Sequence, residues 1–212
     1  MINVRFLQFG SVLCAAVAAI ALAGGFQAQT EKVGVVDFSK VIEASEYGKA
    51  GQVSFTKLKA DRETLLQFID NYRVLTIEQA TNIRDLSLKQ DRSKEEEAKL
   101  ESLKADVIAQ SKKWQALATK SDMSAEDRAL IEDYAKRAQS MGDTMQRWYK
   151  DFSNDLTTWS DKQKIEGIAK ARAAVQEVAK AQGYSMVFEA SVAPYSANDL
   201  TDATLAAMNA KK

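Results

Sequence analysis

The sequence predicts a mostly helical α+β protein, in which a small body of short strands carries a long antiparallel coiled-coil hairpin. From Ser45 to Gln182 there is no proline, and apolar residues recur at alternating spacings of three and four, as in coiled-coil helices. On both sides of this segment, short runs rich in strand-forming residues indicate a β-region. We therefore assign residues 46–182 to a hairpin arm, and residues 29–45 and 183–212 to a β-body.

The first 28 residues have the features of a secretory signal peptide. Arg5 is followed by an uncharged, mostly apolar run over residues 6–25, and small residues cluster at its end. We expect cleavage between residues 23 and 28, which directs the mature chain to the periplasm. An uncleaved membrane anchor is the alternative, because the run is just long enough to span a bilayer. The single cysteine, Cys14, lies inside this run, so the mature chain has no disulfide to support it.

The outgoing half of the hairpin follows a first strand. Lys32–Asp37 reads as a short strand, and Asp37 or Ser39 caps a short helix after it. From Ser45 the helical pattern continues to a tip near residues 119–124. We expect one outgoing helix over this length, loosened by polar residues in its seam. These seam residues are Arg62, Thr76, Gln79, Gln90, Ser93 and Glu97.

The returning half has the cleaner apolar stripe. Ser124–Asp127 has the form of a capping box that opens this helix, and Gly183 stands where a C-terminal glycine is expected. Tyr184–Glu189 then alternates as a strand, and Val192–Ser196 is expected to be an edge strand because its proline cannot donate a ladder hydrogen bond. Thr201 caps a last helix. So small a body cannot bury a stable core alone, and we expect several copies to pool their strands.

The composition argues against an enzyme. The chain has no histidine, and the mature chain would have no cysteine, which excludes His-based acid/base work, Ser-His and Cys-His nucleophiles and the usual zinc and copper ligands. A Gly-rich phosphate loop is also missing. We expect no catalytic residue, metal or cofactor. Lysine plus arginine equal aspartate plus glutamate, 29 against 29, which favours neither nucleic acid nor an anionic membrane as a partner. Membrane contact stays open, without support from the net charge.

The two ends of the chain carry the most specific motifs. Val33–Lys49 contains a strand of the form VGVVD followed by a short helix, and Ala181–Phe188 contains the strand GYSMVF. Together with Tyr195-Ser196 and Asp199–Asp202, these motifs resemble those of the Skp/OmpH family of periplasmic chaperones. The order of strand, hairpin, strands and terminal helix is also similar to the order in that family.

This resemblance implies a homotrimer whose helical arms enclose a cavity. Unfolded outer-membrane proteins would be held there without ATP and kept from aggregating. The chain departs from the best-known members in being near neutral rather than basic and in having longer arms. By resemblance, the body residues that join the copies are Val33, Val35, Val36, Tyr184, Val187, Phe188 and Tyr195.

An aromatic and methionine-rich stretch of the returning helix is the candidate client-binding surface. Counting back from the tip places Trp148 opposite the charged region around Glu97, and Phe152 opposite Ser93, so part of the stretch is expected to stay uncovered. Ordinary packing inside the hairpin is the competing interpretation. The candidate residues are Met141, Met145, Trp148, Tyr149, Phe152 and Trp159. For the whole protein, the alternative function is a structural coiled-coil spacer or tether in the cell envelope.

Overall fold

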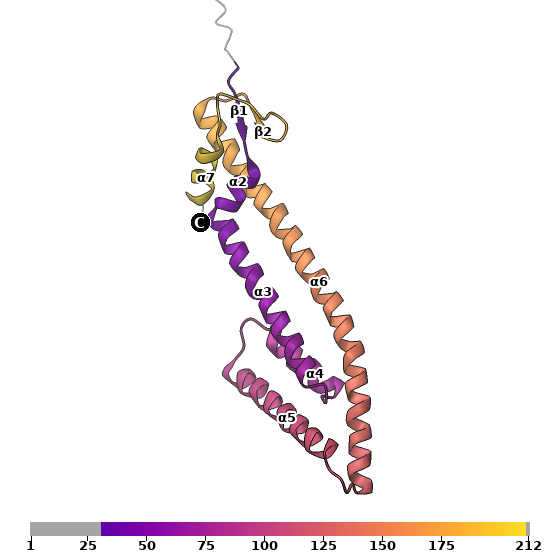
Figure 1. The fold of residues 1–212 in the computed structure, drawn as a ribbon. Helices are drawn as coiled ribbons and strands as arrows, with labels where there is room; N and C mark the ends of the chain where they lie inside the picture. Colours follow the sequence, from indigo (N-terminus) through magenta and orange to yellow (C-terminus); the bar gives the residue numbers. More distant parts are fainter. Residues whose placement is uncertain (1–30, 211–212) are drawn as a thin grey trace, which may run out of the picture. The chain divides into compact units, whose positions relative to one another are not determined.

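The structure is a computed structural model that describes residues 31–210, and these form two compact units. Unit 1 contains the described residues 31–41 and 172–210, and unit 2 contains residues 42–171. The proposed signal peptide lies outside the described residues. Figure 1 shows that most of the described chain is helical and that one small sheet, in unit 1, contains its two strands.

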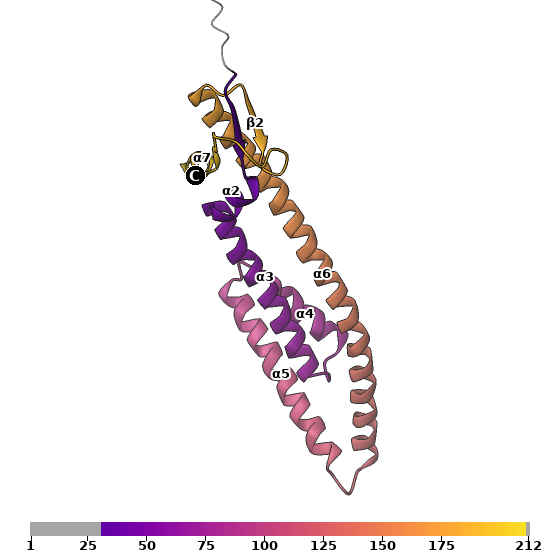
Figure 2. The ribbon, with the colours of Figure 1, turned by 45° about the horizontal axis from the view of Figure 1, so that its top comes forward.

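The sheet of unit 1 pairs two strands that are far apart in sequence. Strand β1 (Val33–Val36) runs parallel to β2 (Met186–Glu189), with Val35 opposite Phe188 (Figure 2). On its other edge, β1 is bridged by the segment around Asp199. There the Val35 N–H donates to the Asn198 carbonyl at 2.9 Å, and the Leu200 N–H donates to the Val35 carbonyl at 2.8 Å. β1 is therefore the central strand of unit 1.

The expected edge strand over Val192–Ser196 is wrong. The N–H groups of Val192 and Ala193 both donate to the Glu189 carbonyl, at 2.9 and 3.2 Å, so a turn follows β2 directly. The chain then continues without regular structure to the Asp199 bridge. Pro194 has no N–H to donate to a ladder, which fits an irregular segment as well as an edge strand.

Two short helices complete unit 1 together with the end of a long one. α2 (Phe38–Ala44) begins in this unit, capped by Asp37, whose carboxylate accepts from the Lys40 N–H at 2.9 Å. The start of α7 (Thr201–Ala210) is hydrogen-bonded to the start of α2, because the Asp37 N–H donates to the Thr201 hydroxyl at 3.0 Å. The buried apolar residues of the unit are Val35, Val36, Val41, Ala174, Val175, Val178, Leu200 and Met208.

Unit 2 differs from the expected simple hairpin, because the outgoing half is three helices. These are α3 (Glu46–Asn71), α4 (Ile77–Leu88) and α5 (Lys94–Ala118), and α6 (Ala125–Gln182) is the returning helix that continues into unit 1. The chain reverses direction after α3, after α4 and after α5 (Figures 1 and 2), and α4 contacts both α3 and α5.

The interruptions have a local cause in helix capping. The Thr76 hydroxyl accepts from the Gln79 N–H at 3.1 Å while the Gln79 side chain accepts from the Thr76 N–H at 3.0 Å, a complete capping box. Ser93 and Glu96 form a second one at the start of α5. Three of the polar residues that we assigned to a coiled-coil seam, Thr76, Gln79 and Ser93, are therefore helix caps.

Both ends of α6 agree with the sequence. Ser124 and Asp127 form the expected capping box, with the Asp127 N–H donating to the Ser124 hydroxyl and the Ser124 N–H to the Asp127 carboxylate, each at 3.1 Å. At the other end Gly183 has a φ of +71°, and the Tyr184 N–H donates to the Ala179 carbonyl at 2.9 Å. This is the Schellman ending that glycine favours. A helix of 58 residues is about 87 Å long.

Candidate interaction surfaces

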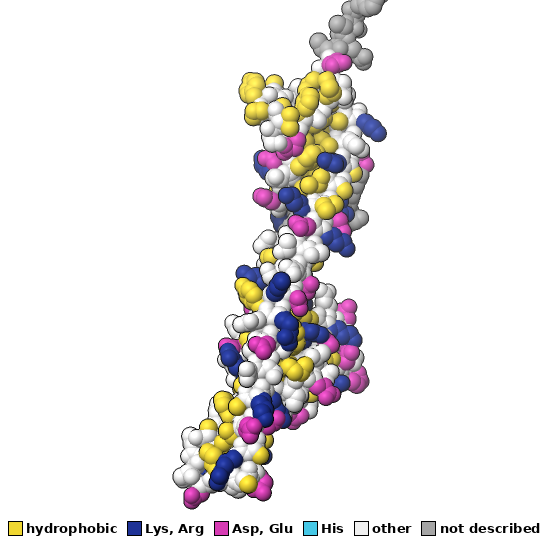
Figure 3. All heavy atoms as spheres, turned by 90° about the vertical axis from the view of Figure 1, so that its right-hand side faces the viewer, with side chains coloured by type: hydrophobic (Ala, Val, Ile, Leu, Met, Phe, Trp, Pro, Cys, Tyr) yellow, Lys and Arg dark blue, Asp and Glu magenta, His cyan; other side chains and the backbone are white. Residues whose placement is uncertain are grey.

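An exposed apolar patch lies on unit 1, beside β2. Met186 and Phe188 point to the same face of the strand and are 45% and 40% exposed, and the following turn adds Val192 and Tyr195, at 73% and 90%. Figure 3 shows hydrophobic side chains gathered on unit 1, at the upper end of that view. We call these four residues the β2 patch. Its strand pairs with β1 on one side only, so within the described residues the other edge has no strand partner.

The structure divides the predicted body residues into three groups, which are buried, half-buried and exposed. Val35 and Val36 are buried inside their own unit, at 7% and 1% exposed, where they pack in its core. Val33, Tyr184 and Val187 are half-buried. Only Phe188 and Tyr195 of the set belong to the β2 patch. Sequence reasoning missed Met186 and Val192, although Met186 could have been found from its spacing of two from Phe188.

Four of the six client-binding candidates lie in the core of unit 2. Met141, Trp148 and Phe152 are 0%, 6% and 7% exposed, and Met145 packs against them. The rest of this core comes from α3, the turn after it, α4 and α5: Leu65, Ile69, Leu75, Ala80, Ile83, Leu100 and Val107. The competing interpretation of ordinary helix packing therefore describes these four residues in this conformation.

The expected exposure of the Trp148 and Phe152 rings is wrong, because the fold-back of α4 changes their neighbours. Arg84 on α4 places its guanidinium 5.0 Å from the Trp148 ring centroid, and Arg62 on α3 lies 5.5 Å from that of Phe152. Arginine stacks well on aromatic faces, so polar residues do cover these rings. The nearby Asp155 carboxylate is 3.5 Å from Arg62.

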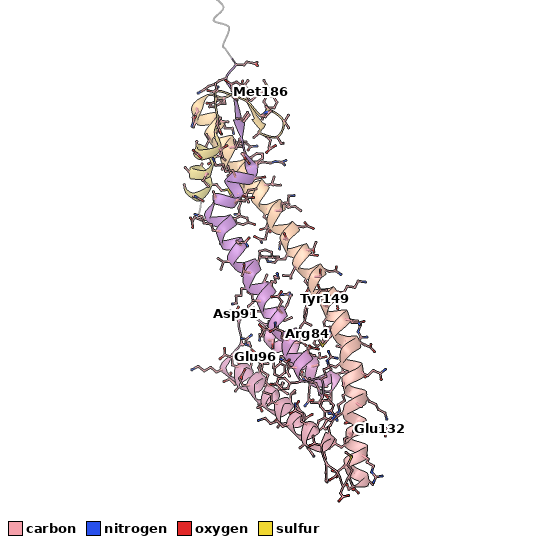
Figure 4. The ribbon with its side chains drawn as sticks, in the orientation of Figure 1. Arg84, Asp91, Glu96, Glu132, Tyr149 and Met186 are labelled. Atoms are coloured by element: carbon pink, nitrogen blue, oxygen red, sulfur yellow. The ribbon has the colours of Figure 1, made fainter. Side chains whose placement is uncertain are left out.

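The remaining two candidates are accessible to different degrees. Tyr149 lies on α6 (Figure 4) and is 71% exposed. Trp159 is half-buried and packs against Phe55 on α3, with ring centroids 5.8 Å apart. Whether any of the six contacts a client stays a prediction, but in this conformation only these two offer substantial aromatic surface.

The charges on the arm are mixed and locally paired. On the face drawn in Figure 3, basic and acidic side chains alternate along the helices. The Lys89 ammonium contacts both Glu96 carboxylate oxygens, at 2.5 and 2.7 Å, and lowers the pKa of that carboxyl together with the Ser93 N–H. Lys120 and the Ser124 N–H lower the pKa of Asp127 in the same way. Such exposed pairs fix helix ends and form no convergent site.

Neither a metal centre nor a membrane-spanning helix is found in the part of the chain that the structure describes. Over residues 31–210, no group of acidic or sulfur side chains is arranged to hold an ion. The helices in the same range are too polar or too short to cross a bilayer.

Comparison with known protein families identifies the class. The family described as Outer membrane protein (OmpH-like) matches residues 32–208, which is nearly the whole described chain. The chain therefore belongs to the OmpH-like family, a family of periplasmic chaperones for outer-membrane proteins rather than of enzymes. This confirms the resemblance seen at the two ends of the sequence. No curated protein sequence matches the chain.

Proposed function

We propose that this protein is an ATP-independent periplasmic holdase, which binds unfolded outer-membrane proteins between helical arms and prevents their aggregation. Membership of the OmpH-like family over residues 32–208 is the observation that carries the proposal. Residues 29–45 and 183–212 would form the oligomerisation body, and residues 46–182 the arm. The signal peptide over residues 1–28 would deliver the chain to the periplasm.

The β2 patch supports assembly of several copies, and we propose three. An exposed strand edge with apolar side chains beside it is a hazard for a monomer, because it can pair with other chains. Phe188 and Tyr195 are the largest side chains of this patch. Covering it with the body of a second copy removes these groups from water and pairs the free edge of β2.

Light scattering of the purified mature chain tests the proposal. The protein is measured alone and after dilution of a urea-unfolded outer-membrane β-barrel protein into it. We expect a mass three times that of the chain, which rises by one client while the client stays soluble. A monomer or dimer that lets the client aggregate would refute the holdase and favour an envelope spacer.

A further inference from the structure

A groove of about 440 Å³ lies in unit 2 between α3 and α6. On the α3 side its lining includes Ala50, Gly51 and Ser54, at positions where packed helices usually carry larger side chains. On the α6 side it is lined by Trp159 and Gln163. We call it the Trp159 groove. The volume falls in the range of about 300–1,000 Å³ that is typical of ligand pockets.

Aromatic rings line this groove and are held in position by neighbours. Trp159 packs against Phe55, with the ring planes at 36°. Tyr47, at the α3 side, donates its hydroxyl proton to the Gln163 carbonyl at 3.3 Å and to the Glu166 carboxylate at 3.2 Å. Burial and the Glu166 carboxylate raise the pKa of Tyr47, so it stays protonated and keeps these bonds. A fixed aromatic surface binds with little further loss of side-chain entropy.

The polar lining of the groove has unused hydrogen-bonding capacity. Gln163 and Gln90, the latter from the turn between α4 and α5, line it with side-chain amides that have no hydrogen-bond partner within residues 31–210. Each amide offers both donors and an acceptor. Lys57 is the only charged residue of the lining, and no carboxylate contributes. A neutral peptide group, with one donor and one acceptor, complements such amides.

These features favour one kind of occupant. A second folded copy would bury about 800 Å² per partner in a standard interface, more than a groove of this size supplies. An extended chain can place one side chain on the rings and its peptide groups against the amides. Aromatic side chains are abundant in the girdles of outer-membrane barrels.

We propose that the Trp159 groove binds an aromatic side chain, with its flanking peptide groups, from an unfolded polypeptide. The proposal rests on the holdase function and gives it a residue-level contact. The groove is built from small residues on one helix and a tryptophan on the other, and it exists before the client arrives. It therefore needs no opening of the unit 2 core, in which Trp148 and Phe152 are buried.

Filling the groove from α3 is the test that separates binding from stability. A Cβ at Gly51 would meet only the Gln163 amide oxygen, at 3.6 Å, which is ordinary contact. Gly51→Leu therefore places a bulky side chain in the groove, and leucine also favours the helix over glycine. Gly142→Leu is the matched control, because a Cβ at Gly142 has nothing within 4 Å. Both changes improve helix propensity, and only the first blocks the groove.

The probe is a urea-unfolded eight-stranded outer-membrane β-barrel protein carrying a fluorescent label. We expect Gly51→Leu to raise its Kd by about tenfold, or about 1.4 kcal/mol, which an aromatic contact can supply. Gly142→Leu should leave the Kd unchanged. Neither variant should unfold at a lower urea concentration than the parent protein.

A second measurement detects client binding in the groove without a substitution that fills it. In protein labelled with 5-fluorotryptophan, the client should shift the fluorine resonance of Trp159 and leave that of Trp148 in place. If the client is held in solution but the Trp159 resonance does not move, and Gly51→Leu binds as well as Gly142→Leu, the groove proposal fails and the holdase stands. If the unaltered protein does not hold the client, both proposals fail.

Discussion

Two neighbouring aromatic residues on α6 give the sharpest test of the structure. Trp148 is 6% exposed and belongs to the unit 2 core, with Arg84 over its ring, whereas Tyr149 is 71% exposed. Truncation of a buried tryptophan to alanine costs about 3–5 kcal/mol of unfolding free energy, of which the arginine contact accounts for about 0.5–2 kcal/mol. We therefore expect Trp148→Ala to lose about 3–5 kcal/mol.

Tyr149→Ala is the control for this change. Tryptophan and tyrosine have similar helix propensities, so the gain from alanine is about equal at the two sites. A substitution at an exposed position usually changes stability by less than about 0.5 kcal/mol. The difference between the two variants therefore reports core packing alone.

Urea unfolding followed by far-UV circular dichroism measures both variants. The protein concentration must be the same throughout, because association would contribute to the stability. If Trp148→Ala loses less than about 1 kcal/mol, or if the two variants lose equal amounts, α4 does not pack on α6 as described. With the client assay added, Tyr149→Ala also shows whether this exposed ring contributes to binding while stability is kept.

Three further predictions concern other parts of the chain. Replacing both Met186 and Phe188 with lysine should reduce the mass in light scattering to that of one chain, because two charges would be buried at the proposed interface; an unchanged oligomer would exclude the β2 patch. Gly183→Ala should lower the unfolding free energy by about 1–2 kcal/mol, since its φ of +71° is costly for other residues, while Gly142→Ala should raise it by up to about 1 kcal/mol; calorimetry showing the same sign for both would contradict this. The pKa of Asp127 is lowered in the folded protein, so its ionised carboxylate stabilises the fold at pH values above the ordinary aspartate pKa of about 4. This contribution is lost as the pH falls through the lower pKa that Asp127 has in the folded protein. Asp127→Asn should therefore be less stable at neutral pH and show a smaller loss on acidification, and a parallel pH profile would show that the pair with Lys120 is irrelevant.

Local chemistry made much of the fold predictable. The apolar run of Val33–Val36 between polar residues and the alternation of Met186–Glu189 identified the two strands. The capping box at Ser124 and the glycine at 183 identified the two ends of α6. These features depend on side chains bonding to their own backbone or on the pleat of a single strand. Neither requires knowledge of distant neighbours.

The breaks in the outgoing half were encoded locally but misread. Thr76 and Gln79, like Ser93 and Glu96, are spaced as capping boxes, yet the surrounding apolar period of three and four continues across them. A helix that stops and restarts in the opposite direction can keep the same period. The pattern alone therefore could not distinguish one long helix from three short ones.

The sequence by itself determined the class of this protein, the two strands, the long returning helix and the family motifs at both ends. Only the tertiary structure decided which aromatic residues of the apolar stripe are available. The fold-back of α4 and α5 covers Trp148 and Phe152, leaves Tyr149 in water and leaves Trp159 beside a groove. Trp148, Phe152 and Trp159 lie on one helical stripe, whereas Tyr149 lies about 100° away from Trp148 around the helix. The three residues of the stripe differ in exposure because burial depends on which distant segment packs over each of them, and that is a property of the chain's path rather than of its period.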